Sequence, residues 1–417
     1  MSSFSVWLKN RLTVQLLWIF WSLMLFIGFL CSKFLITLAL IFPFVWALIE
    51  RFRKTPLEKN NFRQPVYWAL TGTYLLMLFG SIWNANDTTE LITRLRVNLA
   101  FLTLPIAWAL LPRIEMKTIQ IIIKGFLYCL IVGLIWTFVN YALDYEAINE
   151  SLERSKAIPV PHKDHIRFSL MVCLAAYMAL WLGKQENKKV YYFLAICFAI
   201  SLHILAVRSG LLAFYLTLLV VVLVYFFKQG KYLIGSMALV VLFMLPYLAY
   251  LNLESFRNKV ALTIHNIELM QEGYVGEYSD TRRLLSYKIG WEVYKTAPFL
   301  GIGIGNIQPE VFKIYEKNYP EQSPIMPHNQ YLSYLIGLGA IGLFIFLALS
   351  AWVFCYKSSY KSFLVLIFYI IFFSSFLTEN TLFISVGSNL YVYFLLLFVN
   401  VAAIQRADAL EKRNEIL

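Results

Sequence analysis

The sequence predicts an all-α polytopic membrane protein with about twelve transmembrane helices. Of its 417 residues, 60% are hydrophobic and only 14% are charged, whereas an ordinary soluble domain has about 25% charged residues. The apolar residues form repeated runs of roughly twenty, the length that a helix needs to cross a bilayer. These runs do not show the alternating pattern of membrane barrel strands. Because only helices and closed barrels span membranes, a helical bundle is indicated.

Twelve apolar runs account for the predicted spans, and the first two form a tight hairpin. The runs lie near residues 15–31, 34–50, 65–83, 95–112, 118–143, 166–183, 190–207, 210–227, 232–251, 329–354, 362–378 and 388–405. Twelve is an even number, so the two ends of the chain are expected on the same side of the membrane.

The basic residues predict which side that is. They cluster in short loops between apolar runs, for example at Arg51–Lys54 and Lys184–Lys189, and in the tail at Arg406 and Lys412. Lys and Arg are enriched in cytoplasmic loops, so both termini are expected in the cytoplasm. This distribution also explains the net charge of +12 without a nucleic-acid partner.

The chain is expected to divide into four parts. These are residues 1–251 with nine transmembrane helices, 252–327 as a large outer loop, 328–405 with three more transmembrane helices, and 406–417 as a cytoplasmic tail. A loop longer than about fifteen residues usually has internal structure or a function. Helix-like stretches near 256–271, 281–297 and 308–318 therefore predict a helical cap over the outer face.

No metal, cofactor or disulfide is predicted. The five cysteines all lie inside apolar runs without paired spacing, which is typical of small hydrophobic residues. His162 and His165 have the spacing of a metal pair, but no carboxylate or cysteine completes a ligand set. The acidic residues are scattered, so metal-independent chemistry is expected. The first apolar run leads into a second without a cleavage site, so no cleavable signal peptide is expected either.

His328 is the leading candidate for catalysis. It ends the long loop and, with Asn329, opens the next apolar run, on which Gly339 and Gly342 are expected to follow as part of a continuous helix. A histidine titrates near neutral pH and can accept a proton at the edge of a low-dielectric membrane. A histidine that merely satisfies its hydrogen bonds at the boundary is the alternative.

Three arginines are candidates for binding an anion on the outer side. Arg208 ends an apolar run, and Arg282 and Arg283 begin a loop helix. A guanidinium binds phosphate oxygens with paired hydrogen bonds, and a helix N-terminus favours the same anion. The alternatives are a membrane-anchoring arginine for Arg208 and an interfacial helix for the other two.

The glycine-rich stretch Pro298–Asn306 does not predict a nucleotide site. It follows a helix rather than a strand and has no Lys-Ser/Thr after it. A turn that packs closely against the membrane helices is the expected use of its glycines.

Together these motifs resemble the O-antigen ligase and O-antigen polymerase superfamily, most closely the ligase. His328-Asn329, then Gly339 and Gly342, fit the ligase form of the family's His-Asn-x9-Gly-x-x-Gly motif. Arg208 matches an arginine at the outer end of a helix. Arg283 matches the loop arginine that precedes a Pro-x-x-Gly-x-Gly turn, and Arg282 is one residue away in register.

The resemblance implies a membrane glycosyltransferase fold of the GT-C-like kind in the bacterial inner membrane, with a periplasmic active site. The implied donor is an undecaprenyl-diphosphate-linked glycan, and for a ligase the acceptor is lipid A–core in lipopolysaccharide synthesis. Arg208 and Arg283, with Arg282 as the neighbouring candidate, would bind the diphosphate, and His328 would act as general base in an inverting transfer. Asn329 and Glu379 are expected as supporting residues.

Alternative functions remain open at this point. An O-antigen polymerase or a protein O-oligosaccharyltransferase of the same superfamily differs only in its acceptor. A transporter for lipid-linked sugars would place its charges in the middle of the membrane, at broken helices. The candidate arginines and histidine are instead expected at one face, which favours an enzyme.

Overall fold

The computed structural model describes residues 3–52, 64–82, 88–153, 156–227, 230–271 and 279–416, and these ranges are helical with connecting turns. The first part contains α1 (Ser3–Cys31), α2 (Lys33–Phe52), α3 (Pro65–Phe79), α4 (Thr88–Val97), α5 (Ala100–Leu110), α6 (Met116–Leu143), α7 (Tyr145–Glu153) and α8 (His165–Glu186). The remainder contains α9 (Lys189–Leu205), α10 (Arg208–Val222), α11 (Tyr232–Asn252), α12 (Glu254–Gln271), α13 (Ser279–Thr296), α14 (Ile307–Asn318), α15 (Gln330–Cys355), α16 (Phe363–Ser375) and α17 (Ser385–Ile416). The basic residues Arg53 and Lys54 lie outside the described ranges.

The prediction of a polytopic membrane protein is confirmed. Eight segments of the described chain are long and apolar enough to cross a membrane: Thr13–Cys31, Lys33–Phe52, Thr88–Leu110, Met116–Leu143, His165–Glu186, Tyr232–Asn252, Gln330–Lys361 and Ser385–Glu415. The other four predicted runs form shorter apolar helices, namely α3, α9, α10 and α16. Eight of the twelve predicted spans therefore have full length.

Helices α8 and α17 form the centre of the bundle. In each of them 89% of the apolar stretch that could cross the membrane is buried inside the protein, compared with 17% in α11. Helix α11 instead exposes large apolar side chains such as Phe243, Val240 and Met237. A surface of this kind is stable against lipid rather than water, so α11 lies at the periphery.

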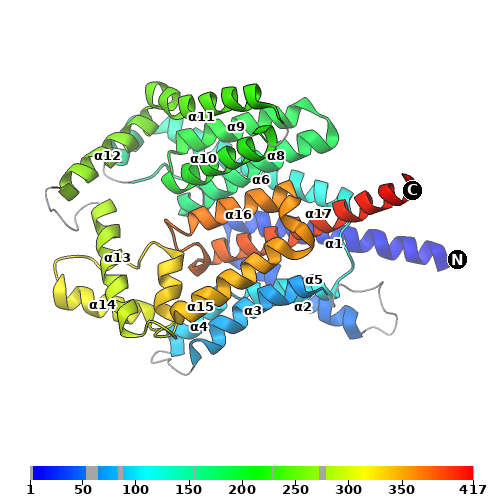
Figure 1. Cartoon of the computed structure of the whole chain (residues 1–417), viewed down its shortest axis with the longest axis horizontal. Coiled ribbons are helices and arrows are strands. Elements are labelled where there is room, and N and C mark those ends of the chain that lie inside the picture. Colours follow the sequence, from blue (N-terminus) through cyan, green and yellow to red (C-terminus); the bar gives the residue numbers. More distant parts are fainter. Residues whose placement is uncertain are drawn as a thin grey trace.

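Figure 1 shows that both termini lie at one end of the molecule and that α12, α13 and α14 lie at the other. These three helices occupy the positions expected between residues 252 and 327. The arrangement places the long loop and the chain ends on opposite sides.

Helix α15 is broken at Gly339, and the expectation of a continuous helix through this residue was wrong. Gly339 has φ 70° and ψ −178°, a conformation that is available to glycine but strained for other residues. The turn after α13 occupies the break: Ile302 and Gly303 donate to the carbonyls of Ile336 and Gly337, while Ala340 and Ile341 donate to those of Pro298 and Phe299.

The glycines of this turn permit a close approach of two backbones. A Cβ atom on Gly301 would lie 2.5 Å from the carbonyl of Gly337, and one on Gly339 would lie 2.1 Å from the oxygen of Phe299. The predicted packing of the glycine-rich turn against a membrane helix is confirmed.

Candidate functional site

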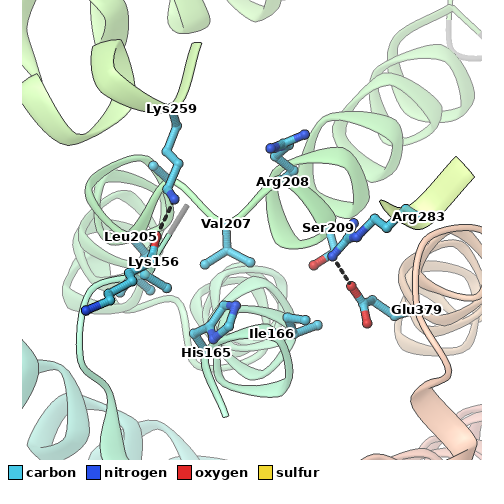
Figure 2. A pocket seen from close by; sticks show the side chains of 12 residues that line it. Lys156, His165, Ile166, Leu205, Val207, Arg208, Ser209, Lys259, Arg283 and Glu379 are labelled. Carbon is cyan, nitrogen blue, oxygen red and sulfur yellow. Dashed lines mark hydrogen bonds and ion pairs between the residues drawn. The ribbon is translucent and has the colours of Figure 1, made fainter. Parts of the chain in front are cut away.

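One polar pocket collects residues from five separate parts of the chain. It is lined by the segment from the end of α7 to the first residues of α8, the turn between α9 and α10, helices α12 and α13, and the turn that follows α16 (Figure 2). Its lining residues are Lys156, Ala157, His165, Ile166, Leu205, Ala206, Val207, Arg208, Ser209, Lys259, Arg283 and Glu379. Four of these side chains are cationic and one is a carboxylate, so the pocket favours an anion.

Arg208 reaches this pocket because the chain turns sharply between α9 and α10. Helix α9 ends at Leu205, its C-cap residue Ala206 is in the left-handed region with φ 49°, and α10 begins at Arg208. The backbone N–H groups in the first turn of α10 are therefore close to the same pocket. A helix N-terminus and a guanidinium together favour a phosphate group.

Arg283 and Arg282 point to different partners. Arg283 Nη2 donates to Glu379 Oε1 at 2.8 Å, whereas Arg282 Nη2 donates to the backbone oxygen of Ser323 at 3.2 Å. Only Arg283 lines the pocket. The geometry therefore favours Arg283 over its neighbour as the anion-binding arginine, and gives no support to a role for Arg282.

Glu379 connects the arginine to the histidine. Its side chain is 3% exposed, and its second oxygen, Oε2, lies 3.1 Å from His328 Nδ1. Burial raises the pKa of the Glu379 carboxyl, but the hydrogen bond from His328 and the charges of Arg283 and Arg167 outweigh that effect, so the net pKa is lowered. Glu379 is therefore an ionised acceptor at neutral pH.

The ionised Glu379 carboxylate determines which ring nitrogen of His328 carries the proton. A carboxylate only accepts hydrogen bonds, so Nδ1 of the neutral imidazole is the protonated nitrogen. The other ring nitrogen, Nε2, is then the basic one. Tyr287 additionally donates from its hydroxyl to the backbone oxygen of His328 at 2.8 Å.

Asn329 holds the backbone beside His328. Its side chain accepts from Leu332 N at 3.0 Å and thereby caps α15, and its amide donates to Leu377 O at 3.2 Å. The second contact ties the start of α15 to the turn that carries Glu379. Asn329 therefore acts on the geometry of the site.

The three motif residues come together as follows. Arg208 and Arg283 line one pocket, and His328 reaches it through the carboxylate of Glu379. Arg208 and His328, which are more than one hundred positions apart in the sequence, are thus connected through the residues of one pocket.

The two histidines near the start of α8 separate in the structure. His165 lines the polar pocket, whereas His162 lines a different, mostly apolar groove beside α1 and α6. Within the described residues, no group of three His, Cys, Asp or Glu side chains could hold a metal ion.

Sequence reasoning missed several residues of the site. Lys156, His165 and Lys259 line the pocket, and Arg167 contributes its charge to Glu379. Lys259 donates to the backbone oxygen of Lys156, which ties α12 to the segment before α8 (Figure 2). These residues belong to no motif, and no local pattern in the sequence marks them as site residues.

A comparison with known families agrees with the resemblance seen in the sequence. The family model Wzy_C, described as O-antigen ligase, matches residues 193–347. This segment runs from α9 into α15 and contains Arg208, Arg283 and His328, while Glu379 and Arg167 lie outside it. No match was found among curated proteins.

Proposed function

We propose that this chain, with an O-antigen ligase match over residues 193–347, transfers a glycan from undecaprenyl diphosphate to a sugar hydroxyl of lipid A–core. The observation that carries the proposal is the shared site. Arg208, Arg283 and Glu379 line one pocket, and His328 is hydrogen-bonded to Glu379. An anion-binding pair and a base are the two functions that such a transfer requires.

The donor diphosphate binds between Arg208 and Arg283. Only one nitrogen of Arg283 donates to Glu379, so its other N–H groups remain for phosphate oxygens. As the glycosidic bond breaks, negative charge develops on the diphosphate. The two guanidinium groups and the N-terminus of α10 stabilise that charge.

His328 is the general base. Its Nε2 takes the proton of the acceptor hydroxyl while that oxygen bonds to the anomeric carbon of the donor sugar. The bond between that carbon and the diphosphate oxygen breaks at the same time, and the lipid diphosphate leaves with the electron pair. Glu379 stabilises the imidazolium that forms. Direct displacement inverts the anomeric centre.

The fold supports this reaction at a membrane surface. The prenyl tail of the donor lies in the bilayer, and the site lies toward the helices α12–α14, opposite the chain ends (Figure 1). We propose that both termini are cytoplasmic in the bacterial inner membrane, and on this proposal the active site faces the periplasm.

A His328→Ala substitution tests the base assignment. Loss of general base catalysis costs about 10²- to 10⁴-fold in rate, and we expect a decrease of that size in transfer from the lipid-linked glycan. His265→Ala is the matched control, because His265 is an exposed histidine on α12. Full transfer by His328→Ala at matched membrane levels would remove histidine from the mechanism.

Lipopolysaccharide from a strain lacking this protein identifies the acceptor. Accumulation of unligated lipid-linked polymer is expected for a ligase. Core capped with a single repeat unit would instead indicate a polymerase, and intact lipopolysaccharide with underglycosylated protein would indicate a protein O-oligosaccharyltransferase.

A further inference from the structure

A buried arginine that the proposed mechanism does not use lies behind the catalytic residues. Arg167, in the first turn of α8, is only 4% exposed. Its Nη2 donates to the backbone oxygen of Asn380 at 3.1 Å, and its Nη1 lies 3.6 Å from Asp164 Oδ1. Its Nε has no hydrogen-bond partner among the described residues. Burying an incompletely paired charge is unfavourable, so its position needs a reason.

Asn380 is the residue after Glu379 and is bonded on every side. Its Oδ1 accepts from Ser333 Oγ at 2.8 Å, and its Nδ2 donates to the backbone oxygen of Pro327. Pro327 precedes His328, and Ser333 lies in the first turn of α15. Asn380 therefore links the position of Glu379 to the position of His328, and Arg167 binds its backbone from the opposite side.

Two further contacts join the same segments. Gln330 N donates to Phe376 O at 2.9 Å, and Leu382 N donates to Gln330 Oε1 at 2.8 Å. The turn that carries Glu379 is thus fastened to the start of α15 before and after the carboxylate. Among the contacts to this turn, the hydrogen bond from Arg167 also brings a full positive charge from α8.

We propose that Arg167 is a positioning residue for glycan transfer: it holds the turn at Glu379–Asn380 so that Glu379 keeps Nδ1 of His328 protonated and Nε2 basic. Arg167 does not line the substrate pocket, so it acts through Glu379. Burial raises the pKa of the Glu379 carboxyl, while His328, Arg283 and Arg167 lower it to a value below the ordinary one, which agrees with this role. The proposal extends the proposed function and depends on His328 as its base.

The charges that face Glu379 come from several helices. They are Arg167 and His165 on α8, Arg208 on α10, Lys259 on α12, Arg283 on α13, and His328 before α15, with Lys156 in the same pocket and Asp164 beside Arg167. Because these groups are close enough to couple, the single variants are compared with one another and in combination.

The experiment measures the imidazole directly. In ¹⁵N-histidine NMR of the purified full-length chain in detergent, with His328 assigned from a His328→Gln sample, we expect wild-type His328 to be the Nδ1-protonated tautomer. Arg167→Gln and Glu379→Gln should each give a mixture of tautomers. Arg257→Gln, which removes an exposed arginine on α12, should leave the wild-type signal. An unchanged His328 signal in folded Arg167→Gln would overturn the proposal.

Transfer kinetics give the second measurement. We expect Arg167→Gln to lower kcat about 10- to 100-fold with the donor KM changed less than about threefold. In the Glu379→Gln background the same change should cost less than about threefold further, because both act through one group. Arg167→Lys should restore part of kcat. Equal losses in both backgrounds, or a raised KM, would contradict the proposal.

The two hypotheses can fail separately. If the tautomer shifts as expected but wild-type protein transfers no glycan from the lipid-linked donor, the proposed function fails and the positioning role of Arg167 stands. If transfer depends on His328 but the tautomer is insensitive to Arg167, only the positioning role fails.

Discussion

Glu379 gives each of its carboxylate oxygens to a different partner, one to Arg283 and the other to His328. This arrangement explains why the Glu379 carboxylate is tolerated although its side chain is almost completely buried. An unpaired carboxylate there would protonate. At the scale of the residue, the site is therefore a set of charges linked by one buried carboxylate, whose pKa its two partners help to lower.

The paired carboxylate makes stability depend on pH. The pKa of Glu379 lies below its ordinary value of 4.5, so its ionised form stabilises the fold above about pH 4.5, and this contribution is lost as the pH falls further. We expect Glu379→Gln to unfold more easily at pH 7, by about 3 kcal/mol, since breaking a buried pair costs about 3–5 kcal/mol. The difference from wild type should shrink below pH 4.5.

Thermal unfolding in detergent at several pH values measures this effect. Glu310→Gln is the control, because Glu310 pairs with Lys313 on the surface and such pairs contribute about 1 kcal/mol or less. A Glu379→Gln protein that is as stable as wild type at pH 7 would contradict the pairing.

Neighbouring arginines offer an internal comparison. Arg283→Ala removes a donor that faces the developing charge, so we expect a decrease in transfer of about 10²-fold. Arg282→Ala removes a contact to Ser323 O outside the pocket, so we expect a change of less than about threefold. Initial rates at matched membrane levels test this, and equal losses in the two variants would show that the pocket does not select Arg283.

Some of these residues were visible in the sequence and others were not. His328 and Arg208 stand out because a motif or an unusual location marks them. Glu379 was only a supporting candidate, and Arg167 was not singled out from the sequence. Glu379 contacts His328, which is more than fifty positions away, and Arg167 contacts Asn380, which is more than two hundred positions away. No local sequence pattern encodes such contacts.

At the scale of the element, α15 shows the limit of periodicity. Its apolar run predicts one continuous helix, and its capping by Asn329 follows the ordinary preference for an N-cap. The break at Gly339 depends on a second segment, the turn at Pro298–Gly303, whose N–H and C=O groups replace those of the interrupted helix. A glycine in an apolar run signals such a partner without identifying it.

Two glycines separate the effects of strain and contact. Gly339→Ala would put an alanine in a positive-φ conformation and place its Cβ atom 2.1 Å from Phe299 O. Gly230 also has a positive φ of +71°, but a Cβ atom there would have nothing within 4 Å. We expect Gly230→Ala to cost about 1–2 kcal/mol. Gly339→Ala should cost at least about 3 kcal/mol, since overpacking adds about 1–3 kcal/mol.

Unfolding temperatures of the two variants in detergent provide the measurement. Comparable decreases for Gly230→Ala and Gly339→Ala would show that the turn can move away from α15 without loss of stability. A larger decrease for Gly339→Ala is the expected result.

At the scale of the whole molecule, the fold was the most predictable part. The length of an apolar run is set by the thickness of the bilayer, so the spans could be read from hydropathy alone. The four shorter helices α3, α9, α10 and α16 were predicted as runs, but their length in the structure was not. Which helices are central could not be predicted, because α8 and α11 are similarly apolar and only packing distinguishes them.

The joint between the turn at Pro298–Gly303 and the broken helix α15 has a mechanical consequence. Four main-chain hydrogen bonds run between the two segments, and the surrounding residues Ile304, Ile336 and Gly337 are buried. Separation of the two segments would leave these backbone N–H and C=O groups without hydrogen-bond partners in a buried position. The segment between α13 and α14 is thus joined firmly to α15 at this point, so on the proposed function any movement that admits a glycan would have to leave this joint intact.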